Sequence, residues 1–402
     1  MGPYLCRVEF VTLANVLYAL LLLAFAANLA SAAYVLLAIR RVDDFQGQNG
    51  PPIGFQPPVT ILKPVCGLDA ALYENLRSFC VQSYPEYQVV FGVRQASDPA
   101  VEVIEKLIKD LPDVDAVLVV DETVAGPNLK VSNLGNMYKS AKHSYFVIAD
   151  SDMRVDEHYL SSVVAPFEDA QVGAVTCLYS GSSVGGLPSL LASMFINEWF
   201  LPSVLVSTKL NELRFGLGAT IAVRRELLDA IGGFNTLSHF LADDHMLGKL
   251  ISEHGFRVVL SNYVVKNIVH EQSLGAMLRH ELRWARTIRS VAPLGHAFSF
   301  FMYGVPLAIL GAVMIDLTFD WDIFEIVIVA LPLVLRSWMH FTVGRKFGLA
   351  RSDQSLWLVP VRDILCLLIW GASFLGRKIN WKQMRYTVDP KGLMSAAEVY
   401  EP

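Results

Sequence analysis

The chain carries little charge. Only 18% of its 402 residues are Asp, Glu, Lys or Arg, whereas 53% are hydrophobic and the mean hydropathy is +0.41. This composition is too apolar for an ordinary soluble protein, so we expect membrane segments. The net charge of −5, without a run of basic residues, gives no reason to expect a nucleic-acid partner.

Cysteine is also scarce. The sequence has 5 cysteines, and no two of them stand at the spacing of zinc ligands. An odd, scattered set argues against a disulfide framework. We therefore expect buried thiols in a reducing compartment for Cys6, Cys66, Cys80, Cys177 and Cys366.

Charge is missing altogether from residues 10–39, and Arg40 and Arg41 follow directly. A helix of this length spans about 45 Å, more than the ~30 Å hydrocarbon core of a bilayer. The basic pair places the next segment in the cytosol. We predict a transmembrane signal anchor over residues 1–41 and, from its Gly- and Pro-rich composition, a linker over 42–57.

The middle of the chain alternates between two patterns. Short β-rich runs at 59–62, 89–93, 116–120 and 145–148 are separated by helical patterns at 69–82, 100–111 and 129–141. Strands separated by helices favour βαβ units and a parallel sheet that is covered on both faces. We predict a Rossmann-like α/β domain with a mostly parallel sheet over residues 58–272.

The last third is apolar again, at 291–315, 326–335 and 355–375. An acidic turn at 316–322 and basic residues within 336–351 agree with the orientation of the first helix. We predict a membrane region of two or three helices over 293–376. Because Arg362 and Asp363 interrupt the last segment, it can be re-entrant or interfacial, and its topology and that of the tail (377–402) stay open.

Two acidic motifs are candidates for chemistry. Asp150 and Asp152 follow a hydrophobic strand, and the carboxyl ends of strands are where ligands bind in open α/β sheets. Carboxylates there suit Mg²⁺, although an Asp-rich turn before a helix gives the same pattern. Asp243 and Asp244 precede a helical pattern, where one can act as a general base or both can simply favour the helix dipole.

A basic, amphipathic helix is predicted just before the membrane region, over 273–292. It contains His280, Arg283 and Trp284. Arg suits a diphosphate and Trp can line a sugar pocket, but a helix lying on the lipid surface has the same composition. Asn128 and Lys130 can likewise bind a nucleotide or begin a helix.

The order of these features resembles the membrane glycosyltransferases of the family 2 and 21 type, which have the GT-A fold. It is most similar to the ceramide glucosyltransferase group and to the bacterial glycosyltransferase that adds N-acetylglucosamine to a hopanoid. The resemblance covers residues 57–390. It rests on segments 59–64 with Gly67, 97–100, 128–134, 149–152, 242–244, 283–284 and 381–386.

The resemblance implies a role for each matching residue. Asp244 is the base, and Arg283 and Trp284 complete the catalytic group. Asp150 and Asp152 bind a divalent metal, Mg²⁺ or Mn²⁺. The UDP-sugar donor is bound by Lys63, Asp98, Asn128, Lys130, Asp150, Asp243 and His280. His280 departs from the family motif, which has Gln or Arg at this position.

The function implied is inverting, metal-dependent transfer of glucose or N-acetylglucosamine from a UDP-sugar to the hydroxyl of a ceramide- or hopanoid-type lipid. The partners are then a UDP-sugar, a lipid acceptor and the bilayer, with no nucleic acid. The catalytic domain would be cytosolic, at the bacterial inner membrane or at the Golgi or endoplasmic reticulum membrane. The alternatives are a processive polysaccharide synthase and a non-catalytic membrane scaffold or transporter.

Overall fold

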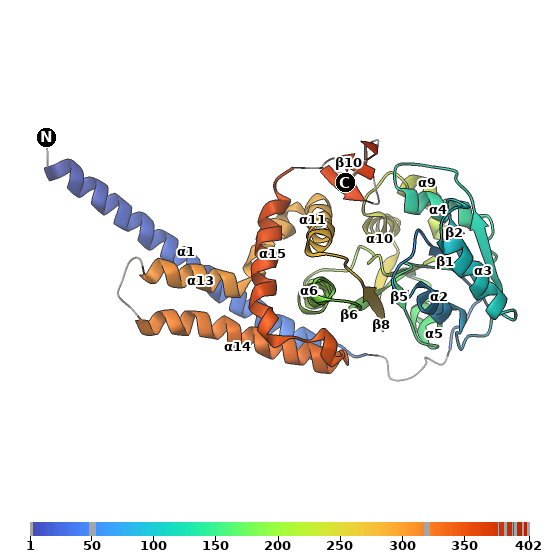
Figure 1. Ribbon diagram of the computed structural model, residues 1–402, viewed down its shortest axis with the longest axis horizontal. Helices are drawn as coiled ribbons and strands as arrows, with labels where there is room; N and C mark the ends of the chain where they lie inside the picture. Colours follow the sequence, from blue (N-terminus) through green and yellow to red (C-terminus); the bar gives the residue numbers. More distant parts are fainter. Residues whose placement is uncertain are drawn as a thin grey trace.

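The computed structural model describes residues 3–47, 54–316, 322–376 and, within the tail, 378–381, 384–387, 389, 392–395 and 398–399. Residues 48–53 of the predicted linker and 317–321 of the acidic turn lie outside the described residues. Figure 1 shows an α/β body at one end and a bundle of long helices that runs away from it.

An eight-stranded sheet forms the centre of the body, in the order β3-β2-β1-β4-β7-β6-β8-β5. The neighbours are parallel except for β7, which pairs antiparallel with β4 and β6, and β5, which pairs antiparallel with β8. The predicted α/β fold with a mostly parallel sheet is confirmed. The strands are β1 (Val59–Pro64), β2 (Tyr87–Val93), β3 (Ala116–Val120), β4 (Tyr145–Ala149), β5 (Met153–Arg154), β6 (Val172–Ser183), β7 (Thr220–Arg224) and β8 (Arg257–Val269).

Both faces of the sheet are buried because the central strands carry apolar side chains on alternate sides. In β4, Val147 and Ala149 pack into one core, whereas Phe146 and Ile148 pack into the other. The first face is covered by α2 (Leu72–Cys80), α3 (Ala100–Asp110) and α5 (Tyr159–Val164). The second is covered by α4 (Leu129–Tyr138), α8 (Arg225–Ala230), α9 (Gly233–Leu237) and α10 (Asp243–Glu253).

Three long helices form the bundle: α1 (Pro3–Asp44), α13 (Gly304–Asp316) and α14 (Asp322–Lys346). A third apolar core joins the body-side ends of α1 and α14 to α7 (Leu201–Leu210). Continuous with α7 are α6 (Leu187–Phe195) and a π-helix, η2 (Ile196–Phe200). In the described part of the chain, four helices are long and apolar enough to cross a membrane, including Leu187–Leu210, which is 78% buried inside the protein.

The apolar run at 291–315 is bent rather than straight. The segment Pro293–Met302, which holds α12 (Pro293–Phe298), meets α13 at 64°. If this pair is a single span, the candidate spans rise to five. The last helix, α15 (Val359–Ser373), packs against α11 (Leu274–Val291) and lies crosswise where the bundle meets the body (Figure 1).

The tail returns to the body. Strands β9 (Lys378–Trp381), β10 (Met384–Thr387) and β11 (Glu398–Val399) form a small antiparallel sheet. Ile379, Tyr386 and Met394 form a small core with Leu241, just before α10. The backbone amide of Leu241 donates to the carbonyl of Gly392. The described part of the tail therefore lies on the same side of the bundle as the body.

Candidate functional site

The site lies at the carboxyl end of β4, where Asp150 and Asp152 follow the strand. The Lys130 ammonium, from the first turn of α4, lies 2.6 Å from the Asp150 Oδ1 atom. The Asn267 side chain, on β8, donates to the Asp152 carboxylate at 2.9 Å. Two neighbouring acids are thus held by partners from different parts of the fold.

The second acidic pair joins the first at this edge. The Lys130 ammonium is 4.0 Å from Asp243 Oδ2 and so lies between Asp150 and Asp243. A Cβ atom built on Gly218 would stand 3.0 Å from Asp244 Oδ2 and 3.8 Å from Asp150 Oδ2. Both carboxylates therefore flank the same glycine, and a larger side chain at 218 would fill the space between them.

Close backbone packing fixes the start of α10. The Gly216 amide donates to the carbonyl of Asp244 at 3.2 Å. A Cβ on Gly248 would approach the backbone of Phe215 and Gly216 to within 2.6 Å, so only glycine allows α10 to lie this close to the loop. This contact places Asp244 beside β4.

Arg283 and Trp284 are neighbours on α11, and Arg283 is the one that interacts with the acids. Burial lowers the pKa of Arg283 to about 10, against the attraction of Asp150, Glu271 and Asp244, so the side chain stays a cation at neutral pH. The indole of Trp284 stacks on Phe195 with ring centroids 5.9 Å apart. The structure thus brings Arg283 close to both acidic motifs.

His280 lies one turn before Trp284, with ring centroids 4.3 Å apart. Its Nδ1 atom is 2.7 Å from the Oε1 atom of Glu271. The Glu271 carboxylate also attracts the Arg283 cation. His280 is therefore held by an acid at the rim of the site.

The remaining donor-site candidates hold the framework. Lys63 is fully buried in β1, donates to the backbone carbonyl of Asp150 and places its ammonium 3.6 Å from the Phe79 ring centroid. Asn128 caps α4 by accepting from the Val131 amide, and its NH₂ group donates to Asp243 at 3.2 Å. Lys63 and Asn128 thus hold Asp150 and Asp243 in place through these hydrogen bonds.

Asp98 lies after β2. Its carboxylate accepts hydrogen bonds from the backbone amide of Gly67 at 3.0 and 2.9 Å, and from the amide of Ala100. Gly67 has a φ of +74°, a conformation that glycine adopts readily. Asp98 therefore holds the loop that follows β1, and its hydrogen bonds to described residues do not reach Asp150 or Asp244.

The acids resist ionisation. Burial, followed by repulsion from Asp150, raises the pKa of Asp152 to about 7. Burial and then the charge of Asp243 raise the pKa of Asp244 to about 6. Burial alone would lower the pKa of Lys130, but Asp150 and Asp243 outweigh it and raise that pKa. Because these carboxylates are buried and repel one another, a cation bound between them would stabilise their charged forms.

The donor atoms of Asp150 and Asp152 fit a hard divalent cation such as Mg²⁺ or Mn²⁺. Among the described residues, no three His, Cys, Asp or Glu side chains converge as a metal site. A cation on this pair would therefore take its other ligands from elsewhere, as Mg²⁺ does with phosphate oxygens.

Three parts of the site had no clear signal in the sequence. Asn267 stands inside a β-rich run, with nothing to link it to Asp152. Phe195 belongs to an apolar helix, and the ring that stacks on Trp284 cannot be identified from spacing. Burial and then the charge of Asp244 raise the pKa of Tyr179, which places this tyrosine near the acids.

Comparison with known proteins supports a common origin. A family model described as glycosyl transferase family 21 matches residues 21–394. Ceramide glucosyltransferase 3 of Caenorhabditis elegans is 26% identical over 239 residues, covering 59% of this chain and 52% of that protein. Ceramide glucosyltransferase of Komagataella phaffii is 36% identical over 110 residues, covering 26% of this chain and 22% of that protein. The chain thus spans about half the length of these relatives or less.

Among solved structures, a mannosyltransferase from Pyrobaculum calidifontis in complex with GDP-Man and Mn²⁺ is similar, with a TM-score of 0.55. The identity is 18%, and the match covers 89% of this chain and 99% of that chain. At this identity the likeness shows the fold alone, and it confirms the predicted GT-A fold.

Proposed function

Because the chain belongs to glycosyl transferase family 21, we propose that it transfers glucose or N-acetylglucosamine from a UDP-sugar to a hydroxyl of a membrane lipid of the ceramide or hopanoid type. The observation that carries this proposal is the convergence of Asp150, Asp244 and Arg283 at one sheet edge beside apolar helices. A displacement in which a diphosphate leaves needs a carboxylate to accept the proton and a cation to stabilise the departing negative charge.

The reaction we propose is one displacement at the anomeric carbon. The acceptor oxygen forms the new bond as the bond to the UDP oxygen breaks, and the electron pair leaves with UDP. Asp244 takes the proton of the lipid hydroxyl. Arg283 stabilises the charge that develops on the diphosphate. A single displacement converts an α-linked donor into a β-linked product.

Asp150 and Asp152 are the residues that we expect to hold a divalent cation, which would supply further positive charge at the diphosphate. Lys130 lies against Asp150 and can hold the carboxylate in place before the cation binds. The Lys63 ammonium holds the backbone of Asp150 by donating to its carbonyl oxygen.

The lipid can approach along α6, η2 and α7. Tyr179 lies near the acids and stacks on Phe200 of η2 with ring centroids 4.5 Å apart. This ring contact thus links η2 to the strand that carries Tyr179 beside the site. Arg345 and Lys346 at the body end of α14, with Arg40 and Arg41 of α1, support a cytosolic catalytic face by the positive-inside rule.

The proposal predicts a lipid product. Purified protein in nanodiscs is incubated with a panel of UDP-sugars and of ceramide- and hopanoid-type lipids, and the products are read by mass spectrometry. We expect one hexose or N-acetylhexosamine added per lipid, and no product from a lipid whose hydroxyl is methylated. Sugar polymers without lipid products would instead indicate a polysaccharide synthase.

Metal-dependent UDP binding should depend on pH. Because the pKa of Asp152 is about 7, protonation competes with the cation, so binding weakens as the pH falls through 7. We expect the dissociation constant for UDP with Mn²⁺ to rise about tenfold per pH unit below that value. Calorimetry from pH 8 to 5.5 measures it. Asp152→Ala should bind weakly at every pH, and a flat wild-type profile would remove Asp152 from the metal site.

A further inference from the structure

Arg362 of α15 contacts α11, the helix that carries Arg283 and Trp284. Its side chain is fully buried and forms a two-pronged ion pair with Glu281 of α11, which is 3% exposed. One contact is 2.9 Å, from the Nη1 atom to the Oε1 atom. Glu281 precedes Arg283 by two residues on α11. The Arg362–Glu281 ion pair therefore holds α11 at the turn that carries Arg283 and Trp284.

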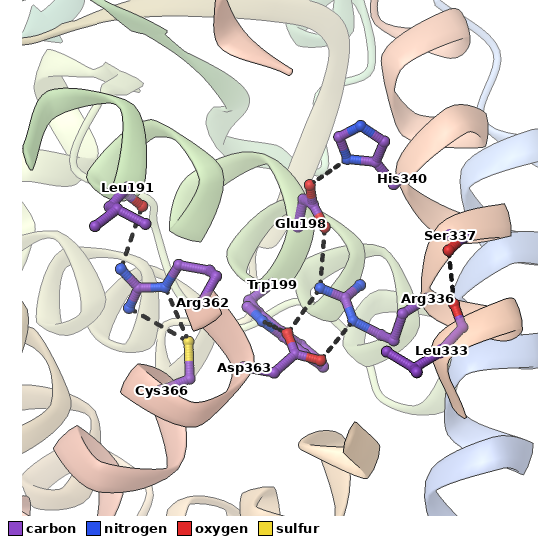
Figure 2. A network of polar contacts seen from close by, with 10 residues as sticks. All are labelled: Leu191, Glu198, Trp199, Leu333, Arg336, Ser337, His340, Arg362, Asp363 and Cys366. Atoms are coloured by element: carbon purple, nitrogen blue, oxygen red, sulfur yellow. Dashed lines mark hydrogen bonds and ion pairs between the residues drawn. The ribbon is translucent and has the colours of Figure 1, made fainter. Parts of the chain in front are cut away.

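A second contact leads from Arg362 to the same motif. The guanidinium lies over the ring of Phe195, 5.4 Å from its centroid, and Phe195 stacks on Trp284 at 5.9 Å with its plane 26° away. Arg362 also donates to the carbonyl of Leu191 in α6 at 3.2 Å (Figure 2). Arg362 thus holds both α11 and the ring on which Trp284 rests.

The next residue, Asp363, faces the other way, toward the bundle. Its carboxylate accepts two hydrogen bonds from Arg336 of α14 and one from the Trp199 indole of η2, all at 3.0 Å (Figure 2). Arg336 also pairs with Glu198 at 3.0 Å. These side chains are all buried, so α15 is tied to α14 and η2 at the point where Arg362 ties it to α11.

We propose that Arg362 is a positioning residue for the Arg283–Trp284 motif, with Asp363 anchoring α15 to the membrane bundle. The proposal rests on the transferase function above. A buried ion pair is a costly way to gain stability, since desolvation offsets much of its attraction. Its two-pronged geometry instead fixes the orientation of α11, which a single apolar contact does not do.

A double-mutant cycle tests whether Arg362 acts through Arg283. Arg362→Lys keeps the charge but loses the planar fork, so we expect kcat/KM to fall about tenfold. In an Arg283→Lys background, the same change should lower kcat/KM by less than about twofold, because the motif is already impaired. Losses that multiply in the double variant would show a general structural effect and overturn the proposal.

Two further variants complete the design. Glu281→Gln/Arg362→Gln removes both charges together, so it leaves no unpaired charge buried, and we expect it to fold but to lose about tenfold in rate. Full activity in this folded variant would also overturn the proposal. Arg345→Lys is the matched control, since Arg345 is 76% exposed in its pair with Asp43, and it should match the wild type. Absence of lipid transfer in the wild type would refute the proposed function itself.

Discussion

Replacing Asp244 with Asn is expected to lower sugar transfer by about 10²–10⁴-fold, the range that a general base supplies. Asn has the same shape and can keep the 2.7 Å hydrogen bond from the His245 amide, but it cannot take a proton from the lipid hydroxyl. Steady-state kinetics at saturating UDP-sugar and lipid measure the loss. UDP affinity, measured by calorimetry, should change little.

The pH profile and a control refine this test. Because the pKa of Asp244 is about 6, the wild-type rate should fall about tenfold per unit below pH 6, as the base becomes protonated. The Asp244→Asn variant should lack this limb. Glu253→Gln, at the exposed far end of α10, should behave like the wild type. Full turnover by Asp244→Asn would remove Asp244 from the role of base.

Replacing Arg283 with Met should lower kcat by about 10²–10³-fold, as removal of one fixed charge-stabilising group does in other enzymes. Arg283 is half-buried, is attracted by Asp150 and Asp244 and stays positively charged, so its loss removes the cation where the diphosphate would form. The effect should appear mainly in kcat, because that charge develops in the transition state.

Arg279→Met is the matched control for this variant. Arg279 is exposed on α11, one turn before Arg283, and the change should leave kcat within about twofold of the wild type. If Arg283→Met instead raised KM for the donor without changing kcat, Arg283 would be a ground-state binding residue rather than a transition-state one.

The sequence predicts the body of the fold well, for a physical reason. Alternating β-rich and helical runs define βαβ units, and Asp150, which directly follows a strand, must lie at the carboxyl edge of the sheet. The antiparallel β7 could not be predicted this way. It is inserted between β4 and β6 and brings Gly218 between Asp150 and Asp244, which depends on a long-range pairing that local patterns do not encode.

The membrane region is harder to predict because hydropathy measures apolarity and not direction. The run at 291–315 is bent, and α15 lies crosswise, although both are apolar enough for a span. The charged residues Arg362 and Asp363 within this apolar segment indicate that α15 is not an ordinary membrane span. Their partners, Glu281 and Arg336, lie on other helices and could not be assigned from spacing. Asn267 cannot be assigned from the sequence for the same reason, since its hydrogen bond to Asp152 joins residues far apart in the chain.

The most direct test of the account is the structure of the product made by the purified protein. UDP-sugar labelled with ¹³C at the anomeric carbon is incubated with the lipid acceptor in nanodiscs, and the product is read by NMR. We predict a single sugar, β-linked to the lipid hydroxyl, with release of one UDP per lipid glycosylated. An α-linked sugar, a polymer, or UDP release without any lipid product would contradict the account.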